Sequence, residues 1–164
     1  MKRIILSGGG TGGHIYPAVA VAEALKRRFG EQVELLFVGA EGRMEMEKIP
    51  ALGYRIVGLP IAGLQRRMDW HNLAVPFKVL RSLRQARRTI RTFGADVVVG
   101  FGGYASAPVL WAAQRMGVPT VIQEQNSYAG VTNKILARGA RRICTAYEGM
   151  ERFFPADRIV LTGN

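Results

Sequence analysis

The chain has 164 residues, of which 23 are Lys or Arg and 12 are Asp or Glu, giving a net charge of +11. This length suits one domain with a sizeable core, and the charge indicates an anionic partner: nucleic acid, phospholipid or a phosphorylated substrate. The single cysteine, Cys144, excludes an internal disulfide and favours a reducing compartment. No apolar run is long enough for a signal peptide or a membrane span, so we expect a cytosolic protein.

Short β-branched runs alternate with amphipathic stretches along the chain. Strands are expected at 3–7, 33–38, 54–58, 96–100, 119–123, 141–145 and 158–162, and helices at 17–29, 43–52, 73–93, 105–116 and 130–138. This alternation predicts an α/β fold with a Rossmann-like, doubly wound parallel sheet. Such sheets bind ligands beyond the carboxyl ends of their strands, so the glycine-rich turns that follow the strands are candidate sites.

The first of these turns is SGGGTGGHIYP, Ser7 to Pro17. Three of its glycines fit the G-x-G-x-x-G pattern, which lets the backbone approach a phosphate at a helix N-terminus. A dinucleotide site also needs an acid about 20 residues farther on, but Glu41 lies 28 residues past Gly13. His14 stands where a P-loop has Lys, and it is either a general base or a residue that orients the loop.

Two later strand ends carry similar polar features. Gly102-Gly103-Tyr104 offers a second anion site, and each glycine turn is expected to lead into a helix with Pro in its opening turn. The segment QEQNS, residues 123–127, forms a hydrogen-bonding set suited to sugar hydroxyls. The two histidines are far apart and no Asp-x-Asp occurs, so we predict no metal site and no cofactor.

The helix expected at 73–93 is strongly basic. One apolar stripe is predicted to face the core: Val79, Leu83, Ala86, Ile90 and Phe93. A second group projects elsewhere and is predicted to insert into an anionic membrane surface: Trp70, Leu73, Phe77, Leu80, Lys78, Arg81 and Arg84. A solvated charged face is the alternative. Nucleic acid is not expected, because no basic motif interleaved with aromatic residues occurs.

Four segments, taken together, resemble the MurG family of peptidoglycan glycosyltransferases: GGGTGGHIYPAVAVAEAL, VVVGFGGYASAP, QEQNSYAGVTNKILA and LTGN. The resemblance implies that residues 1–164 are the acceptor-binding N-terminal half of a GT-B glycosyltransferase at the inner face of the cell membrane. It implies inverting transfer of N-acetylglucosamine from UDP-N-acetylglucosamine to the C4 hydroxyl of the muramic acid of lipid I, an undecaprenyl-linked muramyl peptide, giving lipid II. We expect this chain alone to be inactive, because the donor-binding domain would follow Asn164.

The same resemblance implies roles for individual positions. The residues that would contact UDP-N-acetylglucosamine are Thr11, Gly12, Gly13 and Asn126. Those that would face the acceptor diphosphate are Gly102, Gly103 and Tyr104. His14 is the first candidate for the catalytic base and Glu124 the second. The family commonly has His where this chain has Gln123, so no role is assigned there. Other cell-wall synthesis proteins are further candidate partners.

Two alternatives come from other functional classes. The first is a Rossmann module that binds NAD or another nucleotide, for which Glu41 is poorly placed. The second is a basic domain that binds membranes or nucleic acid without catalysing a reaction.

Overall fold

The computed structural model describes residues 1–61 and 75–163. Within these ranges seven strands form one parallel sheet in the order β3-β2-β1-β4-β5-β6-β7. Each expected strand is confirmed, with ends within two residues of the expected ones: β1 Lys2–Ser7, β2 Val33–Ala40, β3 Ile56–Leu59, β4 Val97–Gly100, β5 Thr120–Glu124, β6 Arg142–Thr145 and β7 Ile159–Leu161.

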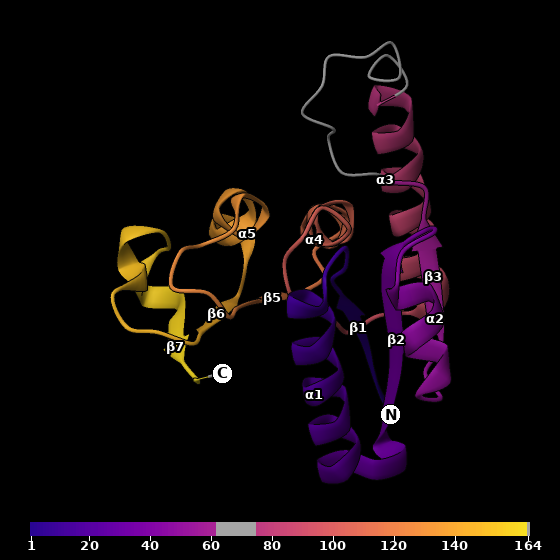
Figure 1. Cartoon of the computed structure of the whole chain (residues 1–164), viewed down its shortest axis with the longest axis horizontal. Coiled ribbons are helices and arrows are strands. Elements are labelled where there is room, and N and C mark those ends of the chain that lie inside the picture. The colour runs from indigo at the N-terminus through magenta and orange to yellow at the C-terminus, as the bar shows by residue number, and fades with distance from the viewer. Residues whose placement is uncertain (62–74, 164) are drawn as a thin grey trace.

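The helices cover both faces of this sheet. Their bounds are α1 Gly12–Phe29, α2 Glu45–Ala51, α3 Val75–Phe93, α4 Ser106–Arg115 and α5 Val131–Leu136. The connections from β1 to β3 run in one direction across the sheet and those from β4 to β7 in the other, so right-handed crossovers place the two sets on opposite faces. Figure 1 shows α1 on one side of the sheet and α4 and α5 on the other.

Each face has its own apolar core. Ile15 and Ala18 of α1 pack with Leu6 and Phe37 of the sheet on one face. On the opposite face, the apolar side chains of α3, α4 and α5 pack against the alternate residues of the same strands, such as Ile5. The expected doubly wound sheet is therefore confirmed.

The strand order reverses between β1 and β4, which are neighbours although β2 and β3 separate them in sequence. Ser7 pairs with Gly100, and the amide of Phe101 donates to the Ser7 carbonyl over 2.8 Å. The chain leaves β1 towards α1 on one face and leaves β4 towards α4 on the other. Ligands bind at such a switch point in open α/β sheets, and both glycine turns meet here.

Helix α1 begins at Gly12, five residues before the expected start. Pro17 is therefore the sixth residue of α1 and does not lie in its opening turn, whereas Pro108 is the third residue of α4 and does. Glycine is a poor helix former, which hides the start of α1 in the sequence, and the N-cap residue Thr11 makes no side-chain capping bond. His14 consequently lies in the first turn of α1.

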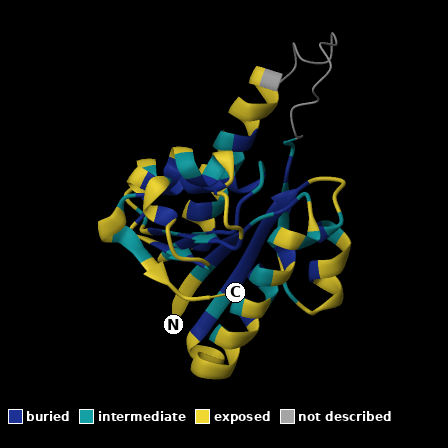
Figure 2. Ribbon diagram, turned by 60° about the vertical axis from the view of Figure 1, so that its left-hand side comes forward, coloured by how far each residue is buried: buried dark blue, intermediate teal, exposed yellow. Residues whose placement is uncertain are grey.

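Helix α3 confirms most of its predicted core stripe. Ala86, Ile90 and Phe93 are buried, but Val79 is 38% exposed, so its assignment to the core was wrong. The reason is tertiary, because the first turns of α3 project past the sheet and are coloured as exposed in Figure 2. No helix in the described part of the chain has the length and apolar character needed to cross a membrane.

Candidate functional site

The two glycine turns touch at the carboxyl ends of β1 and β4. Gly10, Gly102 and Gly103 have φ values of +89°, +91° and +77°, in the left-handed region that favours glycine. A Cβ on Gly103 would collide with the Gly9 carbonyl. Glycine is therefore required in both turns, by backbone conformation and by their close approach.

His14 lies between these turns. Its Nδ1 is 3.0 Å from the Thr11 hydroxyl, and its ring also hydrogen-bonds the Gly9 carbonyl. With the proton on Nδ1, both oxygens are acceptors and Nε2 keeps its lone pair. Nε2 lies 3.2 Å from the position that a Cβ on Gly102 would take, so glycine at this position leaves room in front of Nε2.

The pKa of His14 is lowered from its usual value of 6.5. Burial is the main cause, and it outweighs the opposing effects of the hydrogen bond to Gly9 and of the negative charges on Glu124 and Glu45. The imidazole is therefore neutral at pH 7, which is the form that can accept a proton.

Glu124, at the end of β5, is 1% exposed and accepts four hydrogen bonds. Oε1 accepts from the amide and the side-chain Nδ2 of Asn126, both at 3.1 Å. Oε2 accepts from the amide of Gly130 and from Nδ2 of Asn133, both at 2.9 Å. These donors use the four lone-pair positions of the carboxylate. Glu124 thus anchors the loop and orients Asn126, and it has no acceptor site left for a sugar hydroxyl.

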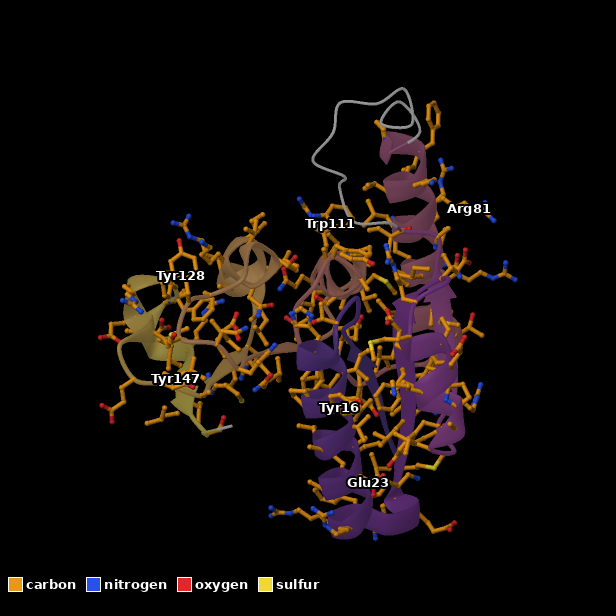
Figure 3. All side chains as sticks on the ribbon, in the orientation of Figure 1. Tyr16, Glu23, Arg81, Trp111, Tyr128 and Tyr147 are labelled. Carbon is orange, nitrogen blue, oxygen red and sulfur yellow. The ribbon has the colours of Figure 1, made fainter. Side chains whose placement is uncertain are left out.

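A groove of about 1150 Å³ runs beside α1 and the ends of β5 and β6. Gly12, Gly13 and Asn126 line it together, so the structure brings these three predicted residues to one place. Figure 3 shows Tyr16 and Tyr147 on either side of the space. Thr11, the fourth predicted residue of this group, is exposed next to Gly12.

Two glutamines of the predicted hydrogen-bonding segment 123–127 lie in this groove. The Oε1 atoms of Gln123 and Gln125 are buried and have no hydrogen-bond partner among the described residues. Both residues line the groove. The sequence predicts a hydrogen-bonding set at 123–127 but gives neither glutamine a role of its own.

Tyr104 is not among the residues that line that groove. Its ring packs on Gly10, and the guanidinium of Arg43 lies 5.9 Å from the ring centroid. Tyr104 also lines an apolar cavity of about 400 Å³ between α3, α4 and α5, together with Trp111 and Ile135. These last two side chains are 38% and 71% exposed. Trp111 could not be singled out from the sequence, because it lies in a run of mostly apolar residues.

The predicted membrane patch is described in part. Trp70 and Leu73 lie outside the described residues. Phe77 and Leu80 are 75% and 45% exposed. They share the exposed face of α3, which carries no acidic residue, with three basic residues: Lys78, Arg81 and Arg84. Figure 3 shows Arg81 extending away from the domain.

Two details weigh against a dinucleotide site. Glu41 follows β2 directly, but its side chain packs over Gly58 on β3, away from the first glycine turn. The amide of Gly10, which a pyrophosphate would use, already donates to the Glu45 carboxylate. In the described ranges, no three His, Cys, Asp or Glu side chains cluster closely enough to hold a metal ion.

Comparison with known proteins identifies the family. Residues 4–145 match the model of the glycosyltransferase family 28 N-terminal domain. The chain is 62% identical, over 99% of its length, to the UDP-N-acetylglucosamine--N-acetylmuramyl-(pentapeptide) pyrophosphoryl-undecaprenol N-acetylglucosamine transferase of Parabacteroides distasonis. It is 61% identical, again over 99% of its length, to the protein of the same name from Cytophaga hutchinsonii. The chain spans 44% of the length of each relative.

The solved structures agree with this assignment. The fold matches the crystal structure of MurG from Acinetobacter baumannii with a TM-score of 0.85 and 34% identity, over 99% of this chain and 46% of that one. The match confirms the expected fold class, a Rossmann-like half of a GT-B glycosyltransferase. The chain therefore belongs to glycosyltransferase family 28 and carries the N-terminal domain of that family.

Proposed function

We propose that this chain is the acceptor-binding half of a peptidoglycan N-acetylglucosaminyltransferase. The whole enzyme would transfer N-acetylglucosamine from UDP-N-acetylglucosamine to the C4 hydroxyl of the muramic acid in lipid I, giving lipid II. The observation that carries this proposal is the meeting of two glycine turns around a neutral, half-buried His14 at the switch point of the sheet. The names of the relatives that are about 60% identical support the same activity.

His14 is our candidate for the base. Nε2 would take the proton of the C4 hydroxyl while the hydroxyl oxygen forms a bond to C1 of the donor sugar. The bond from C1 to the diphosphate oxygen breaks on the opposite face, its electron pair leaves with UDP, and the anomeric configuration inverts. We prefer His14 to Glu124 because four hydrogen-bond donors already occupy the carboxylate oxygens of Glu124.

The two substrates would approach from different sides of His14. UDP-N-acetylglucosamine would contact Thr11, Gly12, Gly13 and Asn126 along the groove, where the N-terminus of the 18-residue helix α1 favours negative charge. The acceptor diphosphate would lie against Gly102, Gly103 and Tyr104. Tyr104 also borders the apolar cavity near Trp111, which suits the lipid part of the acceptor.

A lipid-linked acceptor requires the enzyme to work at a membrane. We propose that the domain binds the inner face of the cell membrane peripherally, through exposed apolar groups among basic ones on α3. Phe77 and Leu80 are the described members of this patch, and Trp70 and Leu73 complete the prediction. Trp111, on the neighbouring helix α4, extends the apolar part of the surface.

The test uses the full-length protein, radiolabelled UDP-N-acetylglucosamine and lipid I in detergent. We expect a labelled lipid product with a β-linkage to C4, and no product from an acceptor whose C4 hydroxyl is methylated. The 164-residue chain alone should give no product. Tight binding of NAD without sugar transfer would contradict the proposal and favour the nucleotide-binding alternative.

A further inference from the structure

Glu45 is a buried acid beside the first glycine turn. It is the first residue of α2 and is only 1% exposed. Both ion pairs found among the described residues involve Glu34, so no cation in these ranges pairs with Glu45. Burying a carboxylate without a cation is costly unless hydrogen bonds compensate, so the position of Glu45 needs a physical reason.

Two backbone amides supply hydrogen bonds to this carboxylate. The amide of Ala40, at the end of β2, donates to Oε1 over 3.0 Å, and the amide of Gly10 donates to Oε2 over 3.4 Å. The sequence also leaves space for the side chain, because a Cβ on Gly9 or on Gly39 would collide with it. Two strand ends therefore lack side chains where the Glu45 carboxylate reaches the first glycine turn.

The peptide group between Gly9 and Gly10 connects Glu45 to His14. Its N–H donates to Glu45, and its carbonyl accepts a hydrogen bond from the His14 ring. The peptide is trans, so its N–H and C=O point in opposite directions. Carboxylate, peptide and imidazole therefore form one hydrogen-bonded chain, in which each bond polarises the next.

We propose that Glu45 is a positioning residue, which holds the Nδ1 side of His14 through the Gly9–Gly10 peptide and so directs Nε2 towards the acceptor hydroxyl. A catalytic base is commonly oriented by a third group in this manner, and here the backbone stands between the carboxylate and the base. This inference rests on the proposed role of His14 as the base.

The electrostatic surroundings of His14 define a measurable consequence. The charged groups that act on it are Glu124 from β5 and Glu45 from α2, and both raise its pKa against the larger effect of burial. Tyr104 is the titratable side chain that the second glycine turn contributes. Removing the charge of Glu45 while leaving Glu124 and Tyr104 in place should therefore lower the pKa of His14 further.

The experiment compares Glu45→Gln with Glu47→Gln in the full-length enzyme. Glu47 is an exposed acid on the same helix and serves as the matched control. NMR follows the titration of the His14 ring, whose signal is identified by its loss in His14→Ala. We expect Glu45→Gln to lower the pKa of His14 by about half to one pH unit, and Glu47→Gln to leave it unchanged.

Kinetics give the second readout. We expect Glu45→Gln to reduce kcat about tenfold, with KM for both substrates little changed, and to cause no further loss in a His14→Ala background. An unchanged pKa of His14, or losses from the two substitutions that multiply, would overturn the proposal. If His14→Ala keeps its kcat, the base assignment fails, but the NMR titration still decides whether Glu45 acts on His14.

If Glu45→Gln does not fold, Glu45→Asp provides a second test of the proposal. Glu45→Asp keeps the negative charge but draws the carboxylate back from the Gly10 amide. We expect a lower kcat with KM unchanged, because His14 is then less firmly held. A wild-type kcat in folded Glu45→Asp would overturn the proposal.

Discussion

Asn133 on α5 donates a hydrogen bond from Nδ2 to the Glu124 carboxylate over 2.9 Å, and both side chains are 1% exposed. The same carboxylate holds Asn126, a residue of the proposed donor side. These two buried side chains therefore hold one wall of the groove in place, and the shape of that wall depends on a buried polar network.

Replacing Glu124 by Gln should destabilise the protein. In Glu124→Gln, an NH2 group replaces one carboxylate oxygen and faces the two N–H groups that donated to that oxygen. We therefore expect the free energy of unfolding to fall by about 1–3 kcal/mol. Urea unfolding of the full-length protein measures this, with Glu148→Gln, an exposed acid, as the control. Full stability combined with a large loss of kcat would instead make Glu124 a chemical participant.

Replacing His14 by Ala should reduce kcat by about 10²–10⁴-fold at pH 7.5, the usual contribution of a general base. Because burial lowers the pKa of His14 below 6.5, the acidic limb of the wild-type kcat/KM profile should lie below that pH. Initial rates from pH 5 to 8 measure both effects. A kcat within a few-fold of wild type would remove His14 from the base role.

Acid should destabilise the wild-type protein through His14. A histidine whose pKa is lowered on folding binds fewer protons in the folded state than in the unfolded state, so its effect is absent above about pH 6.5 and grows as the pH falls below it. We expect the Tm of wild type to fall more between pH 7.5 and 5.5 than the Tm of His14→Gln. Parallel Tm curves for the two proteins would contradict this linkage.

Membrane binding should depend on Phe77. Its side chain is 75% exposed among basic residues, and losing its insertion should cost about 1.5–3 kcal/mol, or roughly tenfold or more in partitioning. Sedimentation with anionic vesicles should show weaker binding for Phe77→Asp. Phe29→Asp, at the far end of α1 and 43% exposed, adds the same charge and should have a smaller effect. Equal binding by both variants would remove the patch.

The sheet could be predicted because β-branched runs and their spacing are local properties of the sequence. The start of α1 could not, because Gly12 and Gly13 have little helix propensity and the helix there depends on contacts with the rest of the fold. The exposure of Val79 had the same origin. A helical wheel shows which residues share a face, but not how far that face extends past the sheet.

In the candidate site, too, some features could be predicted from the sequence and others could not. The two glycine turns could be placed together because the carboxyl ends of parallel strands meet at one edge. The place of Glu45 could not be predicted, since its bond to Gly10 joins positions 35 residues apart. Nor could the saturation of Glu124 be predicted, because it depends on the exact placement of four donors, two of which are backbone amides.

Pro17 within α1 has a consequence for ligand selectivity. Proline has no N–H, so the carbonyl of Gly13 lacks the donor that residue i+4 normally supplies. Gly13 and Pro17 both line the groove. The backbone therefore presents a hydrogen-bond acceptor there that is lost only when Pro17 is replaced by a residue with an N–H, and it favours ligands that carry a hydroxyl or amide donor at that point.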